Sequence, residues 1–380
     1  MKPLRIAFIS PFYPFKGGIA KFSSLLLDAL RAQGYDVLPV SFKALYPGFL
    51  TGGSSEGDNF SKDKRSFEPG LVLYNPFSWF RTARFIRSLQ PDIVLAAYWT
   101  GFLAPLYLLI RRMAGVRTVV LLHNYAAHES FFFEPFMQKL LGVCSDAFIT
   151  LSGVVSRELE TAVPGVPRLQ LYHPVYEPAG KSVSADVARK ELGIGPDVPV
   201  LLFFGYVRRY KGLDLLLQAM PAILKKEPSL KLVVAGHFFE NPARYRDLVR
   251  QLDIAGNVEL YPGYVPAERT GVYFAAADAV VLPYRSATQS GVVQLAYGYG
   301  LPVIATPVGS LPDMIRPGRS GWIAGDVSPE KIAEAVSQFL DSSGRLDALA
   351  DEIRSISREC SWEAFSEAAG RFLEDEAGRR

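Results

Sequence analysis

The chain has 380 residues, of which 49% are hydrophobic and 21% are charged, and this is enough apolar material for two ordinary α/β cores. A net charge of only +3 argues against a nucleic-acid-binding protein, and two cysteines cannot form a disulfide framework, so a reducing, cytoplasmic compartment is expected. The longest apolar stretch, Trp99–Ile110, is too short to span a bilayer, and Ile6–Ile9 runs into Ser10 as a strand would, so neither a membrane span nor a secretion signal is expected.

Apolar runs of strand length alternate with helical patterns through most of the chain, which predicts parallel sheets with helical crossovers. In the first half, strands are expected at Arg5–Ile9, Asp36–Val40, Ile93–Ala97, Thr118–Leu122 and Ala147–Thr150. Helices are expected between them, at Ile19–Gln33, Phe77–Leu89, Leu103–Ala114, Glu134–Leu141 and Gly153–Thr161. The segment Phe42–Pro69 is rich in Gly, Ser and charge, and is expected to be irregular.

A break in periodicity at Pro174–Lys181 separates the two halves, because Pro174, Pro178 and Gly180 interrupt any regular element there. A helix at Leu213–Leu224 follows the first strand of the second half. Strands are expected in this half at Val200–Phe204, Leu230–Ala235, Val258–Tyr261, Ala279–Leu282, Val303–Ala305 and Gly321–Ile323. The chain ends in an expected helix, Trp362–Glu374, with aromatic residues on one side.

A glycine pair, Gly17 and Gly18, follows the first strand and opens the first helix. Glycines at this place let a ligand approach the backbone and leave helix N–H groups accessible. The spacing is not the G-x-G-x-x-G of a dinucleotide fold, so a nicotinamide site is not expected. A simple turn is the alternative.

His123 follows the strand Thr118–Leu122, at the strand end where open α/β sheets bind ligands. A polar contact from its imidazole to a sugar ring is expected. A metal site is not, because the spacing of His123, His128 and Glu129 is not H-E-x-x-H and no acidic third ligand is at a suitable distance. His128 or Glu129 is expected to cap the next helix instead.

A cationic loop at Arg208–Lys211 lies between an apolar strand and an apolar-periodic helix, and the segment Ser290-Gly291-Val292 opens another helix about eighty residues later. Arg208 would form bidentate hydrogen bonds to phosphate oxygens, and Lys211 would add a point charge. Arg209 is expected to face solvent. The small residues at the helix start would leave backbone N–H groups for an anion. Together the two segments predict a diphosphate site, and an exposed charge cluster is the alternative.

Tyr264 and Val265 follow another strand of the second half, in the segment Tyr261–Pro266. Their backbone and side chains are suited to bracket the flat base of a nucleotide. A plain strand-to-helix turn is the alternative.

These motifs together resemble the retaining glycosyltransferases of family 4, the group 1 class with the GT-B architecture. The likeness covers nearly the whole chain and rests on the glycine-rich first loop Pro14–Ala20, on His123, on the Arg208 and Lys211 pair, and on Tyr284–Val293 followed by Gly300–Thr306. It implies an α/β fold with two Rossmann-like domains whose parallel sheets face each other across a cleft. Residues 1–175 would be the acceptor domain, 182–360 the nucleotide-sugar donor domain, and 361–380 a helix that crosses back to the first domain.

The sequence departs from the family pattern at the donor helix. Family members carry a Glu at each end of a nine-residue segment, whereas Thr288–Ala296 contains no carboxylate. Gln289 is expected to replace one carboxylate contact to the sugar hydroxyls, and Gln294 or Leu295 stands nearest to the second Glu. The arginine that usually follows the strand's glycine is Tyr206 here, so Arg208 would serve in its place.

The resemblance implies transfer of a sugar from a nucleotide-sugar donor to a glycan or lipid-linked acceptor, with retention of configuration and without a bound metal or other cofactor. The catalytic residues would be His123, Arg208 and Lys211. The donor-binding residues would be Gly17, Gly18, Tyr264, Val265, Gln289, Ser290, Gly291, Val292 and Gln294. A nucleotide-sugar epimerase and a non-catalytic sugar-nucleotide-binding protein are the alternatives.

The first 180 residues hold 18 basic and 13 acidic side chains, a net charge of +5, whereas the remaining residues have a net charge of −2. A basic first half suits an anionic acceptor or peripheral contact with the inner face of a membrane. The aromatic run Phe131–Phe133 and the cations of Phe42–Pro69 would belong to such a surface. An ordinary solvated surface, with Phe131–Phe133 in the core, is the alternative.

Overall fold

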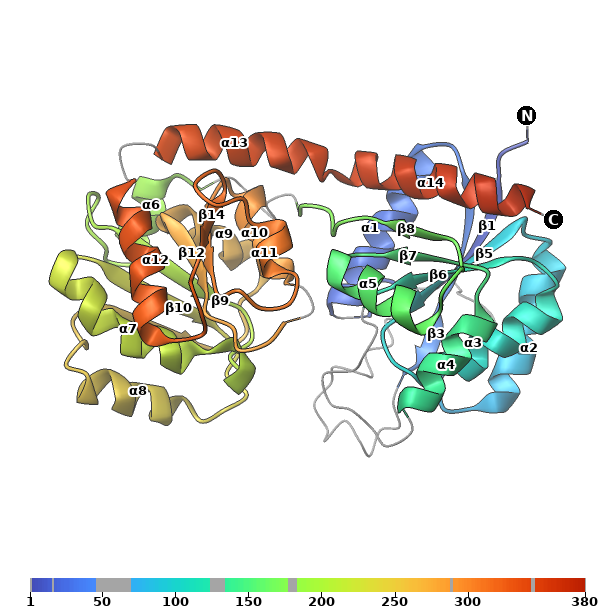
Figure 1. Ribbon diagram of the computed structural model, residues 1–380, viewed down its shortest axis with the longest axis horizontal. Helices are drawn as coiled ribbons and strands as arrows, with labels where there is room; N and C mark the ends of the chain where they lie inside the picture. The colour runs from blue at the N-terminus through green and yellow to red at the C-terminus, as the bar shows by residue number, and fades with distance from the viewer. Residues whose placement is uncertain are drawn as a thin grey trace. The chain divides into compact units, whose positions relative to one another are not determined.

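The computed structural model describes residues 2–15, 17–45, 70–123, 134–176, 183–287, 290–342 and 346–379. The chain forms two compact units (Figure 1). The first unit contains Met1–Tyr172 and Ser361–Arg380, and the second contains His173–Cys360. No helix in the described ranges is both long enough and apolar enough to cross a membrane.

The first unit is built on a parallel sheet of six strands in the order β2-β1-β5-β6-β7-β8. Its central strand β5 is buried at every position, as expected for a strand covered on both faces. The strands are β1 (Arg5–Ile9), β2 (Asp36–Val40), β5 (Ile93–Tyr98), β6 (Thr118–Leu122), β7 (Ala147–Thr150) and β8 (Arg168–Gln170). The five predicted strands of this half are confirmed, and β8 was missed because it is a short, partly exposed edge strand.

Helices cover both faces of this sheet. On one face lie α2 (Pro76–Leu89), α3 (Leu103–Ala114), α4 (Glu134–Cys144) and α5 (Gly153–Ala162). On the other lie α1 (Gly18–Ala32) and α14 (Trp362–Gly378), which are neighbours in Figure 1. Phe365, Ala369 and Leu373 of α14 are buried in this core, and the carboxylate of the fully buried Glu376 pairs with Arg117 at 2.5 Å.

The segment expected to be irregular from Phe42 onward begins with regular structure instead. β3 (Phe42–Ala44) pairs in parallel with β4 (Leu71–Val72) as a two-stranded sheet. Backbone pairing across a long connection is not visible in a run of Gly, Ser and charge, which is why the prediction was wrong at this end. Residues 46–69 lie outside the described ranges.

The second unit is built on a parallel sheet in the order β11-β10-β9-β12-β13-β14. Its strands are β9 (Val200–Phe204), β10 (Lys231–Gly236), β11 (Val258–Pro262), β12 (Ala279–Leu282), β13 (Val303–Ala305) and β14 (Gly321–Ile323). The six predicted strands of this half are therefore confirmed to within one residue. The two parallel sheets confirm the predicted α/β class.

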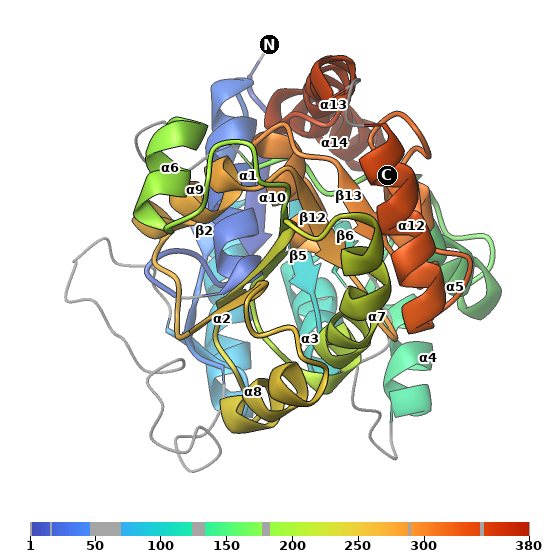
Figure 2. The same ribbon diagram turned by 90° about the vertical axis from the view of Figure 1, so that its left-hand side faces the viewer.

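The helices of the second unit also cover two faces. One face carries α7 (Leu213–Lys226), α8 (Pro242–Gln251) and α12 (Pro329–Asp341), which Figure 2 shows in front of the sheet. The other face carries α9 (Ala267–Ala276), α10 (Gly291–Gly298), α11 (Leu311–Met314) and α13 (Leu346–Glu359). The short α6 (Ala185–Glu191) packs on α9.

The strand order of the second unit fixes where a ligand is most readily bound. From β9 the chain builds outward through β10 and β11, and then returns to place β12 on the other side of β9. The order therefore reverses between β9 and β12, and the loops that follow these two strands diverge and leave a crevice at their carboxyl ends. Those loops contain the cationic segment and the start of α10.

Candidate functional site

The cationic loop is held against the end of β12 by a glycine. After β9 the chain makes a 3-10 turn, Arg209–Lys211, that ends at Gly212 with φ +67°. A Cβ on Gly212 would lie 1.9 Å from the carbonyl oxygen of Pro283, so only glycine allows this approach. The turn and the loop after β12 are therefore in backbone contact.

Lys211 lies beside the start of α10. Its Nζ is 5.0 Å from the centre of the Tyr284 ring. The Cβ position of Gly205 is 3.8 Å from both Lys211 Nζ and Val292 Cγ2, so the ammonium and the first turn of α10 approach the same point at the end of β9. Burial lowers the pKa of Lys211, but the Tyr284 and Tyr210 oxygens outweigh it, and the pKa is raised overall. The side chain is therefore a cation at neutral pH.

Arg285 locks the cationic loop in place. Its guanidinium forms a bidentate pair with Asp214 at the start of α7, with N–O distances of 2.7 and 2.9 Å, and donates to the carbonyl of Arg209 at 3.0 Å. Its backbone N–H donates to the carbonyl of Tyr210 at 2.7 Å. Burial opposes ionisation of Asp214, but the bonds from Arg285 outweigh burial and hold the pKa of the carboxyl below its ordinary value.

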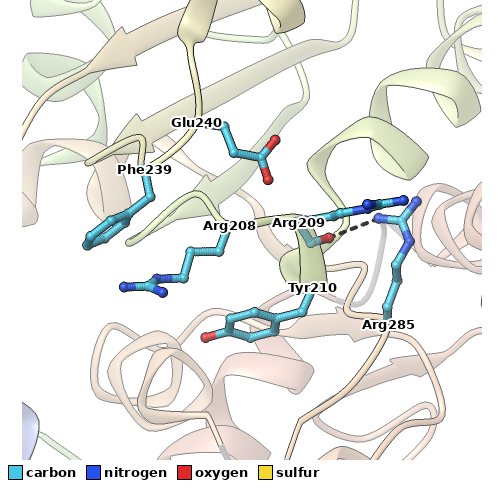
Figure 3. A pocket seen from close by; sticks show the side chains of 6 residues that line it. All are labelled: Arg208, Arg209, Tyr210, Phe239, Glu240 and Arg285. Carbon is cyan, nitrogen blue, oxygen red and sulfur yellow. Dashed lines mark hydrogen bonds between the residues drawn. The ribbon is translucent and has the colours of Figure 1, made fainter. Parts of the chain in front are cut away.

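Arg208 stacks on an aromatic ring. Its guanidinium carbon lies 3.8 Å from the centre of the Phe239 ring, beyond the end of β10 (Figure 3). Arg208 and Phe239 line a pocket of about 520 Å³ together with Arg209, Tyr210, Glu240 and Arg285. The one carboxylate of these six, on Glu240, is bonded to Arg244 and Tyr245 at 3.1 Å each, so the pocket keeps a positive balance.

The start of α10 is less bare than the sequence indicates. Ser290 is the N-cap residue, and its Oγ accepts from the backbone N–H of Val292 at 3.3 Å. Serine is a preferred N-cap because its side chain satisfies one of the helix's first donors. The N–H of Val292, which was expected to be accessible to an anion, is therefore bonded to the cap. The cap uses the N–H of Val292 and not the N–H of Gly291, which is one residue earlier in the chain.

Gln294 lies on the same helix and is 3% exposed. Its Oε1 has no hydrogen-bond donor within the described ranges. A buried amide oxygen without a donor is costly, so a ligand hydroxyl that reached it would gain a hydrogen bond at little further desolvation. Gln289, which is expected to act beside it, lies outside the described residues.

Tyr264 and Val265 line a separate pocket of about 400 Å³ at the end of β11, together with Tyr261, Arg269 and other residues of this segment. Tyr264 is 72% exposed, so its ring is accessible. The structure thus brings Arg208, Lys211, Ser290 and Val292 to the ends of the neighbouring strands β9 and β12, and leaves Tyr264 and Val265 at the end of β11, which β10 separates from β9.

The remaining candidates belong to the first unit. Gly17 has φ +117° at the start of α1, and a Cβ on Gly17 or Gly18 would meet no atom within 4 Å among the described residues, so the backbone there is open to a ligand. His123 follows β6 and is 4% exposed, with its ring edge-on to Phe22 at 4.9 Å between centroids. Residues 124–133, which include His128, Glu129 and Phe131–Phe133, lie outside the described ranges.

Two residues that sequence reasoning missed are Phe239 and Arg285. Each lies just beyond a strand that the sequence analysis found, β10 and β12, so position relative to a strand end was an available signal. Their side-chain partners are far away in the sequence, and no local pattern pairs Phe239 with Arg208 or Arg285 with Asp214. Within the described ranges no group of three or more His, Cys, Asp or Glu residues is placed to hold a metal.

Phe239→Leu is expected to lower turnover about three- to thirtyfold, because Arg208 loses the ring that holds its guanidinium while the apolar volume is kept. Phe239→Trp, which keeps an aromatic face, should restore most of the activity. The measurement is kcat and KM with and without Arg208→Ala in the background. Equal losses from Phe239→Leu in both backgrounds would show that the ring does not act through Arg208.

Family models match both units. Residues 16–172 match the model described as Glycosyltransferase Family 4, and residues 198–342 match the model described as Glycosyl transferases group 1. The chain belongs to this glycosyltransferase family. It is 32% identical to D-inositol 3-phosphate glycosyltransferase 1 of Catenulispora acidiphila over 60% of this chain and 54% of that protein. It is 27% identical to the D-inositol 3-phosphate glycosyltransferase of Segniliparus rotundus over 81% of this chain and 76% of that protein.

The chain therefore spans about half the length of the first relative and about three quarters of the second. Among solved structures, sucrose-phosphate synthase from Thermosynechococcus elongatus superposes with a TM-score of 0.75 at 19% identity, covering 98% of both chains. HepE of Anabaena, solved in complex with UDP, superposes with a TM-score of 0.71 at 15% identity, covering 98% of this chain and 100% of that one. These likenesses confirm the GT-B fold.

Proposed function

We propose that this protein transfers a sugar from a nucleotide-sugar donor to an acceptor hydroxyl with retention of configuration. The observation that carries the proposal is that two loops meet at the ends of β9 and β12. The loop after β9 contains the cations, and the loop after β12 leads into α10. Lys211 and the first turn of α10 approach one point there, and Arg208 stands on the same loop. Such a place suits the diphosphate of a donor.

The proposed reaction requires this site to stabilise a leaving diphosphate. As the bond between the anomeric carbon and the diphosphate oxygen breaks, negative charge grows on that oxygen. The Lys211 ammonium, the Arg208 guanidinium and the N–H groups at the α10 start would stabilise it, and fixed charges cost no reorganisation during the step. The acceptor oxygen would attack from the face that the diphosphate leaves, and its proton would pass to the departing phosphate.

This route needs no carboxylate nucleophile, which fits the absence of Asp and Glu from Thr288–Ala296. The buried Gln294 would accept a hydrogen bond from a donor-sugar hydroxyl, and Gln289 would add a second contact. His123, Gly17 and Gly18 of the first unit would be further ligand-binding residues. Tyr264 and Val265 would hold the base.

The acceptor that we propose is a glycan or a lipid-linked sugar, approached by the basic first half of the chain, with peripheral contact at a membrane face. The relatives are named D-inositol 3-phosphate glycosyltransferases, so inositol 3-phosphate is a second acceptor to test beside it. HepE was solved with UDP-glucose, which makes UDP-glucose the first donor to test.

Incubating the purified protein with UDP-, GDP- and ADP-sugars separates the candidate functions. Slow donor hydrolysis, and transfer when an acceptor is added, is the expected result. An isomerised donor would indicate an epimerase instead. Tight binding without any turnover, with or without acceptors, would indicate a non-catalytic sugar-nucleotide-binding protein.

Gly291→Val is expected to weaken nucleoside-diphosphate binding at least about tenfold while changing the melting temperature little, because the diphosphate would need the space at the helix start. The fold itself has room, since a Cβ on Gly291 would meet only the Tyr176 ring edge, at 3.9 Å. Calorimetric titration and a thermal melt are the two measurements. Similar losses in affinity and in stability would make Gly291 a structural residue.

Turnover is expected to be independent of divalent metal, because Arg208 and Lys211 would supply the positive charge that a metal supplies elsewhere. The assay compares initial rates in a chelator with rates in magnesium or manganese. Loss of activity in the chelator, restored by either metal, would contradict this prediction.

A further inference from the structure

The outer side of α2 exposes an aromatic cluster. Tyr74 and Phe80 are each 51% exposed, and Phe77 is 86% exposed, the largest fraction among the large hydrophobic residues that the described ranges expose. Phe77 and Phe80 lie on the first turns of α2, which begins at Pro76 and is capped by the side chain of Asn75, whose Oδ1 accepts from the N–H of Phe77 at 3.1 Å; Tyr74 lies just before the helix. The opposite side of α2, with Ala83 and Ile86, is buried in the core.

Arginines follow the aromatic cluster along the same exposed side. Arg81, Arg84 and Arg87 are all exposed, and Arg112 is exposed on the neighbouring α3. Neither α2 nor α3 contains an Asp or a Glu. The side chains of this surface are therefore apolar or cationic, with no carboxylate from either helix to offset the charge.

The two kinds of side chain meet in a pocket. Phe77, Phe80, Arg81, Arg84 and Met113 line a space of about 520 Å³ where α2 and α3 lie together. One Nη of Arg81 donates a hydrogen bond to the carbonyl oxygen of Gly70 at 3.3 Å. An apolar lining with guanidinium groups beside it matches a molecule with an anionic head and an apolar body.

We propose that this α2 surface, made of Tyr74, Phe77, Phe80, Arg81, Arg84 and Arg87, docks on a membrane that contains anionic lipids. Aromatic rings settle at the boundary between headgroups and acyl chains, and arginines are drawn to anionic headgroups. An acidic protein surface would satisfy the arginines but would leave Phe77 and Phe80 without an apolar partner. The inference deepens the proposed lipid-linked acceptor and rests on it, but it concerns a surface of the first unit and does not use the diphosphate site.

The test is sedimentation of the whole protein with vesicles of phosphatidylcholine alone and of phosphatidylcholine with phosphatidylglycerol. The wild type is expected to bind the anionic vesicles, and added salt should weaken the binding. Arg81→Gln with Arg84→Gln should lower the partition constant roughly thirtyfold, and Phe77→Ser with Phe80→Ser should lower it by at least about tenfold. Controls are Arg246→Gln on α8 and Val187→Ser on α6, which change an exposed arginine and an exposed aliphatic residue of the second unit.

Three outcomes would overturn the proposal: no binding of the wild type to anionic vesicles, equal binding to neutral ones, or double variants that bind as the wild type does. Thermal melts and nucleotide titrations of each variant are run in parallel. Lipid binding needs no turnover, so a protein that binds vesicles but transfers no sugar would refute the proposed function alone. A protein that turns over donors but ignores lipid would refute this inference alone.

Discussion

Replacing Lys211 with alanine is expected to lower turnover by roughly one to three orders of magnitude, or about 1.4–4 kcal/mol of lost transition-state stabilisation. The reason is its position beside the first turn of α10, with a pKa that keeps it protonated at neutral pH. Arg208→Ala is expected to act in the same direction and range. Both changes should lower kcat more than they raise KM, because the charge on the diphosphate grows as the bond breaks.

Arg209→Ala is the matched control for this prediction. Arg209 is on the same turn and carries the same charge, but its side chain and that of Arg208 point to opposite sides in Figure 3. Arg285 donates its hydrogen bond to the backbone carbonyl of Arg209, which the substitution keeps. Loss of the Arg209 side chain should change turnover less than about threefold. Folded Lys211→Ala and Arg208→Ala proteins that both transfer sugar at the wild-type rate would show that the diphosphate site is elsewhere.

Gly212→Ala is expected to damage both the stability of the protein and its turnover. The new Cβ would lie 1.9 Å from the Pro283 carbonyl, so the turn at Arg209–Lys211 must separate from the end of β12. The expected cost is on the order of 2–4 kcal/mol in the free energy of unfolding, together with a loss of turnover as Lys211 moves. Chemical denaturation and kcat are the measurements.

Gly193→Ala provides the control, because Gly193 has almost the same φ, +68° against +67°, and a Cβ there would meet nothing within 4 Å. It isolates the backbone strain of a left-handed residue, about 1 kcal/mol. If the two variants were equally stable, the contact between the cationic loop and β12 would not be the reason for glycine at 212.

The strands were predictable because their burial is visible in the sequence. A run such as Val200–Phe204 is apolar at every position, as a strand covered on both faces must be, and β12 and β13 follow the same rule. The edge strand β8 and the short pair β3 and β4 were not predictable, since exposed or two-residue strands have no such run.

The place of the site was predictable, but its internal contacts were not. Arg208 and Lys211 were predicted from the cations of one loop and Ser290 from the small residues at a helix start, and residues that follow strands of a parallel sheet gather at one edge. The bidentate pair between Arg285 and Asp214 and the stack of Arg208 on Phe239 join different loops, and nothing local in the sequence indicates either. The cap of Ser290 on Val292 was available from the residue type, because serine is a common N-cap.

A crystal structure with UDP or GDP bound tests the central claim most directly. We expect diphosphate oxygens within about 3 Å of Lys211 Nζ and of the Gly291 N–H, with Arg208 turned to the same group, at the ends of β9 and β12. A diphosphate bound elsewhere, for example at Gly17 and Gly18 with nothing against Lys211, would contradict it.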